Sequence, residues 1–213
     1  MFSNRLIAEK YDRFYKTIQG KEIDSLEKEI ILGHINDITS GHILELGCGT
    51  GHWTEFFCGQ GFKVTAIDES EAMLSIAENK RIKNVTFLKA DATDLPFTDR
   101  SFSAIVSVAM LEFVVDPKKV MEEIDRILIT GGHLVIGCLN ALSELGKNKH
   151  KDEVYKHARF FTPADVEHFL SYFGTPQISY GVYYSPDFKL LEGTESQDSV
   201  EPAFIAASVK KIN

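Results

Sequence analysis

Three glycines at alternate positions, Gly47, Gly49 and Gly51, lie between an apolar run that ends at residue 46 and a segment with helical spacing. Because glycine has no Cβ, it accepts positive φ and lets a ligand approach the backbone closely. A glycine loop between a strand and a helix is typical of nucleotide binding. The loop therefore predicts a bulky polar ligand of the nucleotide type.

Three acidic residues, Glu45, Asp68 and Asp91, lie at or just beyond the ends of three strand-like runs. Asp68 follows Gly47 by about 20 residues, the spacing at which a carboxylate accepts hydrogen bonds from a ribose. The glycines run G-x-G-x-G rather than the G-x-G-x-x-G of dinucleotide sites, and Glu45 would repel a pyrophosphate but suit an ammonium group. Asp91 would suit an adenine amino group. The three carboxylates together therefore favour S-adenosylmethionine over NAD as the ligand.

In these features the chain resembles the class I S-adenosylmethionine-dependent methyltransferases, and most closely the branch that includes the ubiquinone and menaquinone biosynthesis methyltransferases. The resemblance runs from about Tyr11 to Gly137. It is carried by residues 44–51, 66–68, 90–97, 101–117 and 126–136. It implies an α/β, doubly wound, Rossmann-like fold with a mostly parallel seven-stranded sheet and an antiparallel edge strand. It also implies S-adenosylmethionine as the cofactor and S-adenosylhomocysteine as its product.

The resemblance further implies roles at matching positions. The glycines would lie under the methionine part of the cofactor, whose amino group Glu45 would reach. Asp68 would bind the ribose, Asp91 the adenine amino group, and a tyrosine of the N-terminal segment would close over the site. The cofactor residues expected in this way are Tyr11, Glu45, Gly47, Cys48, Gly49, Gly51, Asp68, Glu69, Met73, Asp91, Ala92, Ser107 and Val108.

Candidates for catalysis are fewer. Tyr11 could steady the cationic sulfonium by cation–π attraction, and Glu112 or His157 could serve as a base if the acceptor must lose a proton. The family often has histidine where this chain has Phe113, so a base cannot be assumed there. Tyr155, His157 and Arg159 are candidates to grip the acceptor, with ordinary surface positions in a connecting loop as the alternative.

The elements that must position these residues alternate along the chain. Apolar spacing predicts a helix over 21–38 and strands near 42–46, 63–67, 85–89, 102–108 and 132–138. Asp116-Pro117 opens a helix that Gly131-Gly132 is expected to end, and Thr162-Pro163 opens another that runs through Phe173. Two β-rich runs, 177–184 and 203–210, with an acidic loop between them, complete the pattern. Alternating strands and helices predict a parallel, doubly wound sheet.

These elements predict one methyltransferase domain over 1–213. Its expected parts are an N-terminal helical lid (1–38), a cofactor-binding core (39–138), a substrate-side insert (139–160) and a C-terminal helix and strand pair (161–213). A chain of 213 residues is long enough to bury a sizeable core without disulfides or metals.

The amino-acid composition limits the classes of partner and the cellular environment that we expect for this protein. The net charge of −8, from 31 acidic and 23 basic residues, argues against a nucleic-acid substrate. Three cysteines without C-x-x-C spacing argue against a disulfide framework or a metal site and fit a reducing cytosol. No run approaches the ~20 apolar residues of a membrane span. We expect a cytoplasmic monomer or homodimer.

The sequence thus predicts a methyltransferase that moves the cofactor's methyl group to a small-molecule acceptor by in-line displacement. Two alternatives stay open: a non-catalytic protein that binds S-adenosylmethionine, and an NAD-linked oxidoreductase. An NAD-linked oxidoreductase would give no role to Asp91 or to the turn at residues 95–97.

Overall fold

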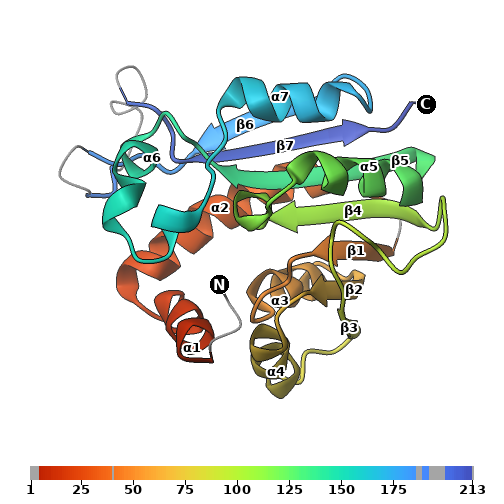
Figure 1. Cartoon of the computed structure of the whole chain (residues 1–213), viewed down its shortest axis with the longest axis horizontal. Helices are drawn as coiled ribbons and strands as arrows, with labels where there is room; N and C mark the ends of the chain where they lie inside the picture. The colour runs from red at the N-terminus through yellow and green to blue at the C-terminus, as the bar shows by residue number, and fades with distance from the viewer. Residues whose placement is uncertain (1–4, 40, 186–188, 192–199, 213) are drawn as a thin grey trace.

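A seven-stranded sheet forms the centre of the protein in the computed structural model, which describes residues 5–39, 41–185, 189–191 and 200–212 (Figure 1). Most of the acidic loop expected between the last two strands lies outside these residues. The elements of the N-terminal part are α1 (Arg5–Phe14), α2 (Ile18–Ile35), β1 (His42–Leu46), α3 (His52–Gly59), β2 (Lys63–Asp68), α4 (Glu71–Asn79), β3 (Val85–Lys89) and β4 (Phe102–Val108). They are followed by η1 (Leu111–Phe113), α5 (Pro117–Ile127), β5 (Leu128–Leu139), α6 (Glu144–Asn148), η2 (Lys149–Lys151), η3 (Tyr155–His157), α7 (Pro163–Ser171), β6 (Gln177–Gly181) and β7 (Phe204–Lys210).

The strand order is β3-β2-β1-β4-β5-β7-β6. Strands β1 to β5 are parallel, whereas β7 is antiparallel to both β5 and β6. The predicted mostly parallel, seven-stranded sheet is therefore confirmed, and its antiparallel strand lies one position in from the edge. The order reverses between β1 and β4, which is where open α/β sheets bind ligands.

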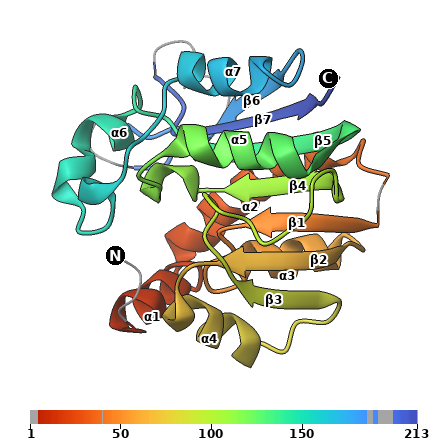
Figure 2. The same cartoon turned by 45° about the vertical axis from the view of Figure 1, so that its right-hand side comes forward.

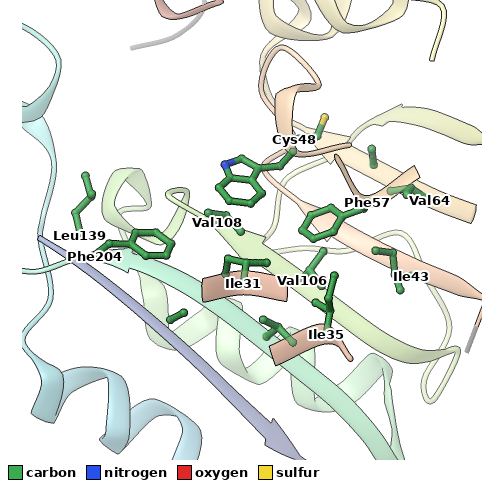
Figure 3. Close-up of a cluster of buried hydrophobic side chains, with 14 of the residues drawn as sticks. Ile31, Ile35, Ile43, Cys48, Phe57, Val64, Val106, Val108, Leu139 and Phe204 are labelled. Carbon is green, nitrogen blue, oxygen red and sulfur yellow. The ribbon is translucent and has the colours of Figure 1, made fainter. Parts of the chain in front are cut away.

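Helices cover both faces of the sheet (Figure 2). On one face, α2 and α3 bury Ile31, Ile35 and Phe57 against Ile43 and Val106 (Figure 3). On the other, α5 and α7 pack against the alternate residues of the same strands. Because successive side chains of a strand point to opposite faces, the run around residues 43–46 can serve two cores.

The helix opened by Asp116-Pro117 ends earlier than the glycines predict. The Asp116 side chain accepts a hydrogen bond from the Lys119 amide (3.2 Å), as expected, but the helix ends at Ile127 and Leu128 already starts β5. Gly131-Gly132 lies inside this long strand, so the prediction was wrong there. The reason is burial: Ile127 and Leu128 are fully buried among the residues of α5 and α7, which fixes the change from helix to strand at that point.

Two further boundaries differ slightly. Helix α2 begins at Ile18, because the Thr17 side chain accepts a hydrogen bond from the Gly20 amide (2.9 Å) and caps the helix there. The segment 139–160, expected to be polar and irregular, contains the end of β5 and the short helices α6, η2 and η3. No helix in the described ranges is long and apolar enough to cross a membrane.

Candidate functional site

The site is a cavity of about 310 Å³ at the carboxyl ends of the parallel strands. The arrowheads of these strands point to the end of the molecule where α1 and α6 lie (Figure 2). Residues from β2, the loops after β1, β2, β3 and β4, and helices α1, α4, η1 and α5 form its wall. They are Tyr11, Gly47, Gly49, Ile67, Asp68, Glu69, Met73, Ala90, Asp91, Ala92, Thr93, Ala109, Met110, Phe113, Val114, Val115, Asp116 and Lys119.

The glycine loop forms one wall of this cavity. Gly47, Gly49 and Gly51 have φ values of 70°, 52° and 78°, a region that favours glycine. A Cβ on Gly47 would overlap the side chain of Met110, so Met110 fills the space that glycine leaves. Gly51 instead faces Ala77 of α4, which shows that the third glycine permits packing between helices rather than contact with the cavity.

Asp68 is fixed by two backbone amides at the end of β2. Its Oδ2 accepts a hydrogen bond from Gly49 N, and its Oδ1 accepts one from Ser70 N, both at 2.8 Å. Burial raises the pKa of Asp68, while these two bonds lower it and a nearby acidic residue, Glu69, raises it further. The carboxylate is therefore held still beside the glycine loop, and Glu69 and Met73 continue the wall from the same turn.

Asp91 lies in a tight turn after β3. Its Oδ1 accepts hydrogen bonds from both the amide and the hydroxyl of Thr93, each at 2.8 Å, and these bonds lower the pKa of Asp91. The loop beyond it is tied to α5, where Arg126 donates to the carbonyls of Leu95 (3.0 Å) and Phe97 (2.7 Å). The turn at residues 95–97 thus anchors the loop that carries Asp91.

Tyr11 closes the cavity from α1. Its hydroxyl lies 2.9 Å from the hydroxyl of Tyr15, and its Cε1 would lie 3.8 Å from a Cβ on Gly49. Burial raises the pKa of Tyr11 to about 12, with a contribution from the Asp68 carboxylate. Tyr11 is therefore neutral at physiological pH and presents a phenol and a ring face rather than a base.

Five residues expected at the cofactor lie behind the cavity wall instead. Glu45 is 2% exposed and its Oε2 accepts a hydrogen bond from the Thr54 hydroxyl of α3 at 2.6 Å; burial raises the pKa of Glu45 to about 8. Cys48 and Val108 belong to the hydrophobic core (Figure 3). The five residues that do not line the cavity are Glu45, Cys48, Gly51, Ser107 and Val108.

The expected bases also lie outside the lining. Glu112 is 1% exposed, and its Oε1 accepts a hydrogen bond from Leu139 N at 2.6 Å. Burial raises the pKa of Glu112 to about 7. His157 and Arg159 are exposed, whereas Tyr155 is half-buried and packs edge-on against Phe160.

Sequence reasoning missed the part of the wall that follows β4. Ala109 adopts a positive φ of 50°, and Met110, Val114, Val115 and Lys119 then contribute to the lining. The position of this segment, directly after a strand beside the point where the strand order reverses, was a usable signal. Its apolar residues carry no chemistry of their own, which is why the pattern of carboxylates and glycines did not mark them.

Comparison with known proteins gives the family. Residues 44–136 match the family model described as a methyltransferase domain. A Thermotoga maritima S-adenosylmethionine-dependent methyltransferase, described as a possible histamine N-methyltransferase, superimposes with a TM-score of 0.75 at 26% identity over 97% of each chain. This chain belongs to the class I S-adenosylmethionine-dependent methyltransferases.

Two protein sequences extend the comparison. An uncharacterised Methanocaldococcus jannaschii protein is 32% identical over 96% of this methyltransferase and 97% of its own length. The demethylmenaquinone methyltransferase of Clavibacter sepedonicus is 35% identical over 61% of this chain and 54% of its own length. This chain therefore spans about half the length of that relative. The protein is an enzyme that uses S-adenosylmethionine, as the sequence predicted.

Proposed function

We propose that this methyltransferase transfers the methyl group to a small-molecule acceptor by in-line displacement. The observation that supports the proposal is a single cavity. Its wall includes Tyr11 together with Gly47, Gly49, Asp68 and Asp91. The backbone at Gly47 and Gly49 lines the cavity, so a bound ligand can lie directly against it. Carboxylates at two strand ends and a backbone cradle between them fit a nucleoside with an amino-acid tail.

In this proposal each part of the wall has one task. Asp68 accepts from the ribose hydroxyls, because its two amide bonds hold it in place beside the loop. Asp91, Ala92 and Met73 surround the adenine, and Gly47 and Gly49 lie beside the methionine part. Glu45 acts from behind the loop through Thr54, which orders the start of α3. Cys48, Gly51, Ser107 and Val108 support the loop by packing.

In-line methyl transfer requires mainly that the acceptor and the methyl group of the cofactor be aligned. The bound cofactor supplies an activated methyl group on a positively charged sulfur. Tyr11 closes the site, excludes water and offers a ring face to positive charge. Met110 and Phe113 supply the apolar wall on the side of η1. Positioning of this kind can contribute several kcal/mol to the rate enhancement.

The relatives are named for different acceptors, demethylmenaquinone in one case and possibly histamine in the other. Their names therefore support methyl transfer to a small molecule without selecting one for this enzyme.

Isothermal titration with S-adenosylhomocysteine, with NAD as the parallel control, tests the cofactor part of the proposal. We expect S-adenosylhomocysteine to bind and NAD not to bind. A screen with methyl-labelled cofactor then measures transfer to small molecules and to protein extract. Transfer of label to macromolecules alone would contradict a small-molecule acceptor.

A further inference from the structure

A stack of two rings connects the end of α1 to the residue that follows the glycine loop. The ring of Tyr15, in the turn after α1, lies against the imidazole of His52, the first residue of α3. The two ring centroids are 3.7 Å apart and the ring planes differ by 12°. Neither residue lines the cavity, so any effect of this stack on a bound cofactor must pass through another residue.

The imidazole of His52 is held by a carboxylate of α2. Its Nε2 lies 2.6 Å from Asp24 Oδ1. The other oxygen of the same carboxylate, Oδ2, accepts a hydrogen bond from Lys28 Nζ at 2.7 Å. Lys28 Nζ also lies over the rings of Trp53 and Phe56, 5.9 Å and 5.6 Å from their centroids. Asp24 is therefore fixed by a cation and in turn fixes the imidazole.

The short distance between His52 and Asp24 assigns a proton to Nε2. Although burial raises the pKa of Asp24, its bonds to His52 and Lys28 bring that pKa below its ordinary value. The carboxylate is therefore ionised at neutral pH and can only accept, so His52 Nε2 must carry a hydrogen and donate it. Lys28 Nζ lies 3.2 Å from the same nitrogen but finds no lone pair there. The ring of His52 cannot turn over without losing this bond.

The stack continues from Tyr15 to Tyr11, which lines the cavity. The two hydroxyls lie 2.9 Å apart, and the rings meet edge to face with centroids 5.4 Å apart and planes at 79°. Tyr11 Cε1 would lie 3.8 Å from a Cβ on Gly49. One series of contacts thus runs from Asp24 through His52 and Tyr15 to the ring that closes over the glycine loop.

We propose that Asp24, His52 and Tyr15 are positioning residues for methyl transfer, which set the place of the Tyr11 ring without touching the cofactor. The inference rests on the proposed function, in which Tyr11 closes the site and offers its ring to the sulfonium. Attraction between a ring face and a cation requires the cation to lie close over the ring. Helix α1 has only 10 residues, and a helix of that length is marginally stable without packing. Contacts outside the cavity must therefore keep Tyr11 in place.

The first test compares His52 variants of the full chain by titration calorimetry. His52→Ala removes both the stack and the bond to Asp24, and it should weaken S-adenosylmethionine binding by about tenfold. S-adenosylhomocysteine lacks the positive charge on sulfur, so its affinity should fall less. His52→Phe keeps a ring against Tyr15 and should recover most of the lost affinity. Glu55→Gln, an exposed position of the same helix, is the matched control and should change neither ligand's affinity.

A double-mutant cycle shows whether His52 acts through Tyr15. Tyr15→Leu removes the ring that His52 holds, but it takes no residue from the cavity lining. In the Tyr15→Leu background, His52→Ala should change the Kd of S-adenosylmethionine by less than about twofold. If His52 only stabilised α3, the same substitution would weaken binding equally in both backgrounds. That result would overturn the inference.

A measurement on the wild type tests the bond between His52 and Asp24 directly. Nitrogen NMR of protein with isotope-labelled histidine distinguishes a protonated from an unprotonated ring nitrogen. We expect His52 to carry a hydrogen on Nε2 with and without S-adenosylhomocysteine. A bare Nε2 would show that Asp24 does not hold the ring and would overturn the inference. Asp24→Ala should weaken S-adenosylmethionine binding in the wild type but not in His52→Phe, which has no bond to Asp24 to lose.

The outcomes separate the two proposals. Failure of the wild type to bind either S-adenosylmethionine or S-adenosylhomocysteine would defeat the proposed function itself. Normal binding by the wild type, with the same affinities in His52→Ala, would overturn only the positioning role. Equal losses for the two ligands in His52→Ala would also overturn it, because the contact of the Tyr11 ring with the positive charge would then not depend on His52.

Discussion

Asp68 is held by two backbone amides and still has lone pairs free to face the cavity. Asp68→Ala should weaken S-adenosylhomocysteine binding, because the hydrogen bonds expected to the ribose are worth on the order of 1–3 kcal/mol, or roughly 5- to 150-fold in Kd. Titration calorimetry measures the change. Asp94→Ala, an exposed acidic residue outside the lining, is the control. Equal affinities for all three proteins would remove Asp68 from the site.

The residues that line the cavity were predictable where they lie in or next to the loops that follow the strands. Gly47, Gly49, Asp68 and Asp91 line the cavity as expected. The role of Glu45 was not predictable in the same way. A strand residue points to one face or the other of the sheet, and the side chain that it meets there decides what its carboxylate binds. In the structure this side chain is Thr54 of α3, whose hydroxyl donates a hydrogen bond to the Glu45 carboxylate that the sequence pattern assigned to the ligand.

Among the elements, α1 is tied to the end of α4 by an ion pair. Asp12 Oδ1 lies 2.6 Å from Lys80 Nζ at the end of α4. Although burial raises the pKa of Asp12, its bonds to Lys16 and Lys80 bring it down to about 2. The pair therefore stays charged at neutral pH and holds Tyr11 over the glycine loop.

Lys80→Ala should loosen α1 and weaken S-adenosylhomocysteine binding by about fivefold, taking about 1 kcal/mol for a partly exposed pair. Hydrogen exchange should rise in residues 5–14 and stay unchanged in β4. The exposed Lys83→Ala serves as the control. Unchanged exchange in α1 would show that other contacts hold this helix.

The type of each element was more predictable than its ends. Helical spacing and apolar runs marked α2 and strands β1 to β4 to within a few residues. The junction at Ile127 and Leu128 was not predictable, because two glycines four residues later looked like a stop signal. Only the packing of both residues between α5 and α7 shows that the strand starts first.

At the scale of the whole molecule, the cavity joins elements from both halves of the sheet. Ligand contacts from α1, the loops after β1 and β2, and η1 would be lost together on unfolding. S-adenosylhomocysteine at 100 times its Kd should therefore add about 2.7 kcal/mol, raising the melting temperature by roughly 5–11 °C for a domain of this size. Scanning calorimetry measures the shift, and NAD at the same concentration should give none.

The overall topology could be predicted only in part from the residues. Alternation of strands and helices indicates a parallel, doubly wound sheet, but nothing in the spacing places β7 between β5 and β6. That order depends on pairing across a long stretch of chain, such as Leu139 with Phe204. The resemblance to a family, rather than the apolar pattern, supplied the antiparallel pair.

The position of β7 has a consequence during synthesis on the ribosome. Strand β5 is complete at Leu139, yet its neighbour on one side begins only at Phe204. Until those residues emerge, a nascent chain exposes a long apolar strand with unpaired amides and carbonyls, the kind of edge to which other chains attach. The finished sheet buries that edge in its interior. The interval between translating residue 139 and residue 210 is therefore the period in which this edge of a nascent chain is open to pairing with other chains.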